Sequence, residues 1–119
     1  MQKTNSKPKI LVVCGRNKRR SRTAEYIFKN DERFQIKSAG LSVQSEVILN
    51  AKLVEWADII IVMNNSQKAR IQEQYRTFAI PRIENIRIAD EYEFLDPELI
   101  LLLKERINTI FGSFSIFDS

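Results

Sequence analysis

The residues of this chain best suited to chemistry lie in one short stretch, which runs from Cys14 to Ser21. Cys14 is the only cysteine of the chain, and Arg20 follows it six positions later, directly before Ser21. The residues between them are one glycine, one asparagine and three cations, namely Gly15, Arg16, Asn17, Lys18 and Arg19. A glycine-bearing loop that enters a helix offers backbone N–H groups to a phosphate. The stretch therefore predicts a phosphate-binding loop that carries a cysteine nucleophile.

Each residue type in this loop has a property that phosphate chemistry needs. The guanidinium of Arg20 can hold two phosphate oxygens at once, and Asn17 tolerates a left-handed backbone that folds the loop over an anion. Nearby cations and helix N-termini favour the thiolate form of a cysteine, to which the Ser21 hydroxyl can donate. A thiolate facing a bound phosphoester can attack phosphorus and expel an alcohol. We assign Cys14 and Arg20 to catalysis and the other loop residues, with Ser21, to substrate binding.

This reaction also needs a group that protonates the leaving oxygen and later activates water, and a carboxylate can do both in turn. Asp90 follows the strand predicted at residues 83–88, so it is expected at the same end of the sheet as the loop. Asp96 is the second candidate, although the sequence Asp96-Pro97-Glu98 is typical of a helix start. We predict Asp90 as the general acid and base.

Composition removes several other kinds of active site. The 119 residues contain no histidine and a single cysteine, which excludes Cys/His and Ser/His pairs, intrachain disulfides and thiolate zinc sites. We therefore expect no metal and no other cofactor. A lone thiol fits the reducing cytoplasm. The first nine residues are polar, unlike a signal peptide, and no apolar run approaches the roughly 20 residues that span a membrane.

The hydrophobic pattern predicts alternating strands and helices. Residues 1–8 are expected to form a flexible tail, and residues 9–119 a single domain. Helices are predicted from residue 21 or 22 onward and at residues 46–57, 67–76 and 97–111, with Gly112 ending the last one. Residues 113–119 favour no element. Strands are predicted at residues 9–13, 34–39, 58–63 and 83–88.

This alternation predicts an α/β fold with a parallel sheet between two helical layers. Four strands with right-handed crossovers favour a flavodoxin-like, three-layer α/β/α arrangement with strand order 2-1-3-4. Ligands of such sheets bind beyond the carboxyl ends of the strands, at the point beside the first strand where the order reverses. The Cys14 loop is expected at that point, so the fold and the chemistry indicate the same site.

At these residues the chain resembles the low-molecular-weight protein tyrosine phosphatases. The spacing Cys14-x5-Arg20-Ser21 matches that family's signature, and the resemblance spans roughly residues 9 to 111. It implies a flavodoxin-like fold, a phosphocysteine intermediate, no metal and an aspartic acid/base on a late loop. Further matches to the family are Asn17, Ser38-Ala39-Gly40, Ala57-Asp58 and Val62-Met63. Two more, Asp90 to Phe94 and Asp96 to Leu99, are shared with a short bacterial branch of predicted tyrosine phosphatases.

Some positions depart from the family's usual pattern. Asp90 has an aromatic residue two positions later, Tyr92, but Glu91 replaces the usual proline. Cations stand where the family usually has a glycine, an apolar residue lining the aryl pocket, a second cysteine and a proline, at Arg16, Lys18, Arg19 and Arg22 respectively.

The resemblance and the loop together predict a phosphatase of phosphate monoesters, with phosphotyrosine as the first candidate substrate. Its partner would be a phosphorylated protein or a small phosphomonoester. One alternative is a non-catalytic protein on the same fold that binds phosphate or nucleic acid; few aromatic residues interleave with the five cations of residues 16–22, which makes nucleic acid the weaker choice. Arsenate reduction is a third possibility, but it needs additional cysteines that the chain lacks.

Overall fold

A computed structural model describes the backbone of residues 7–118 and the side chains of residues 7–111. Four parallel strands form one sheet in the order β2-β1-β3-β4, which confirms the predicted topology. None of the helices within the described residues is both long and apolar enough to span a membrane. The elements in chain order are β1 (Lys9–Cys14), α1 (Arg20–Phe28), β2 (Gln35–Gly40), α2 (Ala51–Trp56), β3 (Ile59–Val62), α3 (Asn65–Gln74), β4 (Arg82–Asn85) and α4 (Pro97–Asp118).

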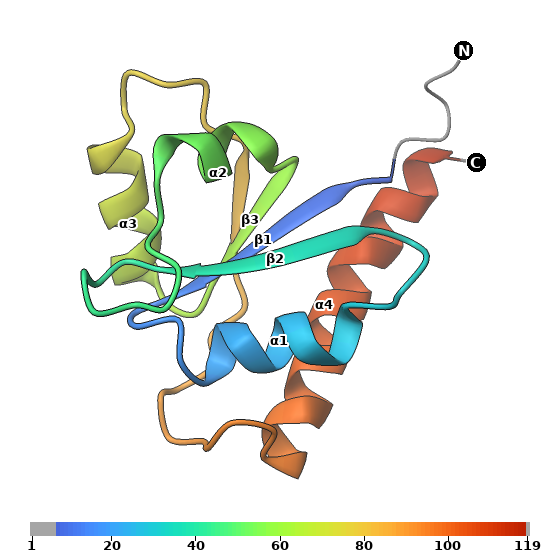
Figure 1. Cartoon of the computed structure of the whole chain (residues 1–119). Coiled ribbons are helices and arrows are strands. Elements are labelled where there is room, and N and C mark those ends of the chain that lie inside the picture. The colour runs from blue at the N-terminus through green and yellow to red at the C-terminus, as the bar shows by residue number, and fades with distance from the viewer. Residues whose placement is uncertain (1–6, 119) are drawn as a thin grey trace.

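The sheet is covered on both faces, with α1 and α4 on one side and α2 and α3 on the other (Figure 1). The central strand β1 explains why both layers are needed. Its side chains alternate between the faces, and Ile10 and Leu11, on opposite faces, are both fully buried. A continuous apolar run of this kind is stable only where helices exclude water from both sides.

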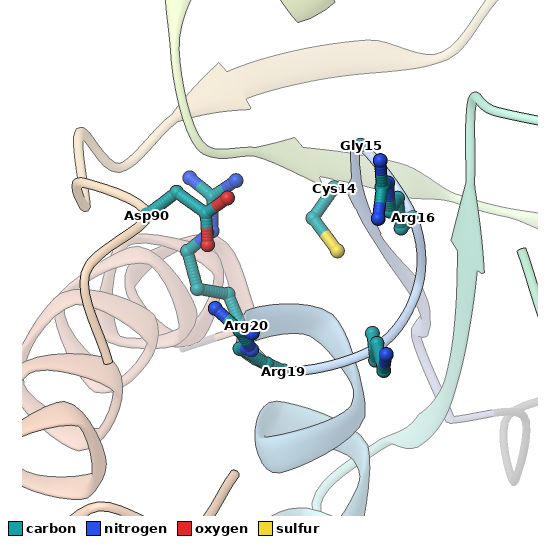
Figure 2. A pocket seen from close by; sticks show the side chains of 7 residues that line it. Cys14, Gly15, Arg16, Arg19, Arg20 and Asp90 are labelled. Carbon is teal, nitrogen blue, oxygen red and sulfur yellow. The ribbon is translucent and has the colours of Figure 1, made fainter. Parts of the chain in front are cut away.

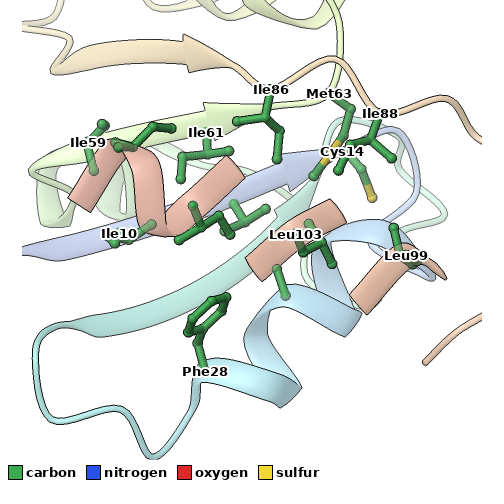
Figure 3. Close-up of a cluster of buried hydrophobic side chains, with 14 of the residues drawn as sticks. Ile10, Cys14, Phe28, Ile59, Ile61, Met63, Ile86, Ile88, Leu99 and Leu103 are labelled. Carbon is green, nitrogen blue, oxygen red and sulfur yellow. The ribbon is translucent and has the colours of Figure 1, made fainter. Parts of the chain in front are cut away.

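Cys14 is the last residue of β1, and it belongs to the core cluster under α1 and α4 (Figure 3). Met63 and Ile88, which follow β3 and β4, are buried in the same cluster, as is Leu99 near the start of α4. The carboxyl ends of three strands therefore surround the thiol with packed apolar groups. This packing holds the end of β1 in place, and the loop after Cys14 starts from that point.

The helix predicted at residues 46–57 is half wrong, because only α2, Ala51–Trp56, is helical. Residues 46 and 47 form bends, and Ile48 makes an isolated parallel bridge to Gly40 at the end of β2. The N–H of Gly40 donates to the Val47 carbonyl at 2.8 Å, and the N–H of Leu49 donates to the Gly40 carbonyl at 2.8 Å. Asn50 then caps the helix by accepting from the N–H of Leu53 at 3.0 Å. Pairing with β2 outweighs the helical periodicity of this segment.

Two smaller predictions are also corrected. The strand predicted at residues 83–88 ends at Asn85, because Arg87 has a positive φ of 56°. The last helix passes through Gly112 to Asp118; no described glycine has a positive φ, so Gly112 does not act as a left-handed cap. Residues 1–6 of the predicted tail lie outside the described residues, but the Pro8 carbonyl already pairs with the N–H of Gln35 at 2.9 Å.

Candidate active site

A pocket of about 320 Å³ opens where the loop after β1 meets the segment after β4 (Figure 2). Asp90 is the one residue of its lining that comes from outside the stretch from Cys14 to Arg20. The predicted loop and the predicted acid therefore meet at a single cavity. The residues that line it are Cys14, Gly15, Arg16, Lys18, Arg19, Arg20 and Asp90.

The Cys14 sulfur points into the space that the loop encloses (Figure 2). Cys14 is only 3% exposed. Two groups lie at hydrogen-bond distance from its Sγ atom. The backbone N–H of Asn17 donates to Sγ at 3.2 Å, and the Ser21 Oγ lies 3.0 Å away. The Asn17 N–H therefore donates to the sulfur, and the Ser21 hydroxyl lies where it can donate as well.

Asn17 connects the loop to neighbouring segments through hydrogen bonds of its side chain. Its φ is 53°, the left-handed conformation predicted for it, and its side chain is completely buried. The amide nitrogen of Asn17 donates to Ser21 Oγ at 2.8 Å and to Ser38 Oγ at 2.9 Å, and its oxygen accepts from the N–H of Val47 at 3.0 Å. Because Ser21 Oγ accepts from Asn17, its own hydrogen is free to point at Cys14. Asn17 and Ser21 thus lie behind the nucleophile, not in the pocket lining where sequence reasoning expected substrate contacts.

The hydrogen-bond network around Cys14 extends to residues for which no role was predicted from the sequence. Ser38 Oγ donates to the carboxylate of Glu25 on α1. The series of hydrogen bonds that starts at the Cys14 sulfur therefore ends at a carboxylate. Gly40 is required by close approach, because a Cβ there would lie 2.6 Å from the Asn17 nitrogen and 2.0 Å from Ser45 Oγ. The Ser38-Ala39-Gly40 match was the sequence signal for the first and last of these residues, whereas Glu25, which matches the same short bacterial branch within Thr23-Ala24-Glu25, had no predicted role.

The loop presents several N–H groups that the protein itself does not use. No acceptor is recorded within residues 7–118 for the backbone N–H groups of Gly15, Arg16, Lys18 and Arg19. Gly15 and Arg19 are partly buried, and buried or partly buried N–H groups nearly always have a partner in a folded protein. Arg19 also occupies the N-cap of α1, so the positive end of that helix faces the same space. The loop is therefore a preformed cradle for an anion.

Arg20 forms one wall of the cradle and is 5% exposed. Its Nη1 donates to the Ile88 carbonyl at 2.7 Å, and its Nε lies 3.6 Å from Asp90 Oδ1. No protein acceptor is recorded among the described residues for Nη2, which leaves this donor for a phosphate oxygen. Arg20 consequently joins the loop after β1 to the segment after β4.

The structure separates the two candidate acids. Asp90 lines the pocket with its side chain 63% exposed, beside the Arg20 guanidinium. Asp96 does not line the pocket; its Oδ1 accepts from the N–H of Glu98 at 2.8 Å, where α4 begins. Of the two, only Asp90 is within the cavity that contains the Cys14 sulfur.

The fold has parallels among solved structures. The chain aligns with YwlE arginine phosphatase from Geobacillus stearothermophilus over 94% of this chain and 97% of that one, at 19% identity and a TM-score of 0.70. It aligns with SP-PTP, a low-molecular-weight protein tyrosine phosphatase from Streptococcus pyogenes, over 89% and 92%, at 17% identity and a TM-score of 0.74. The tyrosine phosphatase Wzb from Escherichia coli K30, in complex with phosphate, aligns over 82% and 91%, at 19% identity and a TM-score of 0.63.

The fold is that of the low-molecular-weight protein tyrosine phosphatases. No family model matches the sequence, and no curated protein matches it either. At 15 to 21% identity the structural likeness concerns the fold.

One feature of the pocket differs from what the resemblance to these phosphatases implies. No aromatic or long aliphatic side chain lines it. Tyr92 turns away and packs against the core, with its hydroxyl 3.3 Å from Glu98. Desolvation, together with the carboxylates of Glu98 and Glu91, raises the pKa of Tyr92, so its hydroxyl stays protonated at neutral pH and donates to Glu98. The ring is not positioned to sandwich an aryl phosphate.

The segment that carries Asp90 is anchored mainly at its ends. The N–H of Ile88 donates to the Met63 carbonyl at 3.2 Å, and the N–H of Leu95 donates to Thr23 Oγ1 at 3.0 Å. Thr23 is fully buried, so this contact ties the segment to α1.

Within residues 7–118, no three histidine, cysteine, aspartate or glutamate side chains gather as metal ligands would.

Proposed function

We propose that this chain hydrolyses phosphate monoesters through a phosphocysteine intermediate on Cys14. One observation carries the proposal: the Cys14 sulfur opens into a pocket ringed by unpaired loop N–H groups and by Arg20. Such a cradle binds a tetrahedral dianion through backbone dipoles and a guanidinium fork. A sulfur nucleophile beneath a bound phosphoryl group can attack it in line.

In the first step the Cys14 thiolate attacks phosphorus. An S–P bond forms, the P–O bond to the leaving group breaks, and that oxygen takes a proton from the Asp90 carboxylic acid. Arg20 and the loop N–H groups stabilise the charge on the equatorial oxygens. The Ser21 hydroxyl holds the thiolate by its hydrogen bond before attack.

In the second step water attacks the phosphocysteine. Asp90, now a carboxylate, removes a proton from the water; the P–O bond forms as the S–P bond breaks. Inorganic phosphate leaves, and Cys14 returns as a thiolate stabilised by Ser21 and by the N–H of Asn17. The exposure of Asp90 lets water reach it without a conformational change. Because a thiol nucleophile must stay reduced, we place the enzyme in the cytoplasm.

For the substrate we propose a phosphorylated protein, with phosphotyrosine as the first candidate because the loop motif resembles that of tyrosine phosphatases. Phosphoarginine, a phosphoramidate and not an ester, is the second candidate; in its first step the P–N bond would break and Asp90 would protonate the leaving guanidine nitrogen. Two facts favour it: arginine phosphatases are among the matched structures, and the pocket lacks an aromatic ring while offering Asp90, whose carboxylate can face a guanidinium. Peptides that carry either residue distinguish the two by their kcat/KM.

The proposal is tested by hydrolysis of an aryl phosphate from acidic to neutral pH. We expect turnover by the natural chain and a loss of at least ~10³-fold in Cys14→Ser, because the weaker oxygen nucleophile has no base beside it. Full activity in Cys14→Ser, or no turnover at any pH on aryl phosphate and on both phosphopeptides, would refute a cysteine phosphatase. Salt-dependent binding of nucleic acid without turnover would support the binding protein instead, and thiol-dependent reduction of arsenate would support the reductase.

A further inference from the structure

A groove leads from the pocket along α1, and it is lined in three connected parts. The pocket shares Lys18 and Arg19 with a neighbouring hollow of about 390 Å³, which Arg22, Glu46, Glu93 and Phe94 complete. That hollow shares three of these residues with a further one of about 360 Å³. The last hollow is lined by Arg22, Glu25, Tyr26, Lys29, Glu46, Val47 and Phe94. We call these two hollows together the side groove.

The far end of the side groove holds its apolar side chains, Tyr26, Phe94 and Val47, beside the charged side chains of Arg22, Glu25, Lys29 and Glu46. Tyr26 on α1 and Phe94 on the Asp90 segment form an edge-to-face pair, with ring centroids 6.0 Å apart and an interplanar angle of 72°. Both rings remain 43 to 50% exposed, and Val47 beside them is 44% exposed. Surface aromatic residues that gather beside a catalytic pocket are typical of a binding surface.

The near end of the side groove is lined by three cations, Lys18, Arg19 and Arg22, and by two carboxylates, Glu46 and Glu93, and it adjoins Arg16 of the pocket. Arg16 and Lys18 are exposed at the pocket rim, and within the described residues no ion pair is recorded for either of them. Arg22, further along, lies 3.2 Å from Glu46. A bound phosphate would engage Arg20 and the loop N–H groups, and it would leave the charges of Arg16 and Lys18 uncompensated. This end therefore suits a second anionic group on the substrate.

We propose that the side groove binds the polypeptide chain flanking the phosphorylated residue, with an acidic side chain near Lys18 and Arg19 and an apolar one on the Tyr26–Phe94 pair. The proposal rests on the phosphatase function proposed above. A small phosphomonoester fills the pocket alone, whereas the groove continues through two more hollows of comparable volume. An anionic group followed by an apolar group, in line with the phosphate, is what successive side chains of an extended peptide supply.

The test compares two synthetic phosphopeptides with an aryl phosphate. One peptide carries Glu and Leu at successive positions on both sides of the phosphorylated residue, which is phosphotyrosine, or phosphoarginine if the substrate panel selects it. The other carries Ala at those positions. We expect the natural chain to prefer the Glu/Leu peptide in kcat/KM, and Phe94→Ala and Tyr26→Ala each to lower kcat/KM for that peptide by about tenfold or more. Neither variant should change the hydrolysis of the aryl phosphate.

Phe78→Ala is the matched control, because Phe78 is also a partly exposed ring in an edge-to-face pair, with Tyr75, and lines none of the three hollows. It should leave every rate unchanged. Equal kcat/KM for the two peptides, or equal losses on peptide and aryl phosphate in Phe94→Ala, would overturn the proposal.

A binding measurement separates failure of the groove from failure of the phosphatase. Fluorescence anisotropy of the labelled Glu/Leu peptide on Cys14→Ser needs no turnover. Binding that weakens about tenfold when Phe94→Ala is added supports the groove even if the natural chain hydrolyses nothing. Affinity that is indifferent to Phe94→Ala overturns the groove while leaving hydrolysis of aryl phosphate to decide the proposed function.

Discussion

The loop after β1 and the segment after β4 form opposite sides of one pocket, but they are built differently. In the first, Cys14, Asn17, Arg20 and Ser21 are all at most 5% exposed, and three of them belong to one hydrogen-bond network. In the second, Asp90 is 63% exposed and is held by a single ion pair to Arg20 at 3.6 Å. One side is rigid and preformed, and the other is open to water.

This difference follows from what each group must do. A nucleophile and its anion cradle need fixed geometry, because an error of about an ångström in attack distance lowers the rate strongly. An acid that serves leaving groups of different shape, and then water, needs access more than rigidity. We therefore expect substitutions behind Cys14 to affect catalysis through small changes of packing, whereas substitutions around Asp90 should lower the hydrolysis of an aryl phosphate only when they remove its carboxylate.

The largest effect is expected where the two sides meet, at Arg20. Arg20→Lys should lower kcat/KM by about 10³-fold or more, because a single ammonium cannot hold the Ile88 carbonyl, Asp90 and two phosphate oxygens together. Steady-state kinetics on an aryl phosphate measures this. The control is Arg76→Lys, whose exposed side chain pairs with Glu73 on α3. Near-normal activity in Arg20→Lys would mean that the guanidinium does not bind the phosphate.

The next effect compares the two carboxylates of the open side. Asp90→Asn should lower kcat by about 10² to 10⁴-fold on an aryl phosphate with a poor leaving group, and less with a good one, because a general acid is lost. Asp96→Asn should leave kcat nearly unchanged, since its side chain caps α4. The reverse order would move the acid to Asp96.

A smaller effect tests the rigid side. Ser21→Ala removes the hydroxyl that faces the Cys14 sulfur at 3.0 Å. Hydrogen bonds to charged groups contribute about 1.5 to 3 kcal/mol, so kcat should fall about 10 to 100-fold with little change in KM. Ser66→Ala, an exposed hydroxyl on α3, is the control. If Ser21→Ala raised KM and left kcat intact, Ser21 would bind substrate and not the thiolate.

The smallest effect concerns a pair outside both sides of the pocket. The hydrogen bonds from Arg33 lower the pKa of Asp31 from 3.8. The pair therefore stabilises the folded state above pH 3.8, and this contribution is lost as the pH falls through the lowered value. Asp31→Asn should cost less than about 1 kcal/mol near neutral pH and nothing in activity. Urea unfolding measures the difference, which should shrink below pH 3.8; a loss that stayed constant with pH would exclude the ion pair as its cause.

The two sides of the pocket also differ in how well they could be predicted from the sequence. The spacing of Cys14, Asn17 and Arg20 is local, because seven consecutive residues fold into one loop on a strand whose burial is evident from its apolar run. The acid segment has no such local signal: Asp90 was predicted only from its position after a predicted strand, with Asp96 as the second candidate, and the structure adds that Asp90 lines the pocket. The roles of Glu25 and of the Val47 N–H could not be predicted either, since they depend on contacts to residues far away in the sequence.

The central claim is that Cys14 itself takes the phosphoryl group, and rapid mixing with excess aryl phosphate tests it most directly. The reaction is quenched in acid within the first turnover, the released phenol is measured, and the peptide containing Cys14 is analysed by mass spectrometry. We predict a burst of phenol matching the enzyme concentration and a phosphoryl group on Cys14, both absent in Cys14→Ser. Turnover without a burst, or with the phosphoryl group on another residue, would contradict the account.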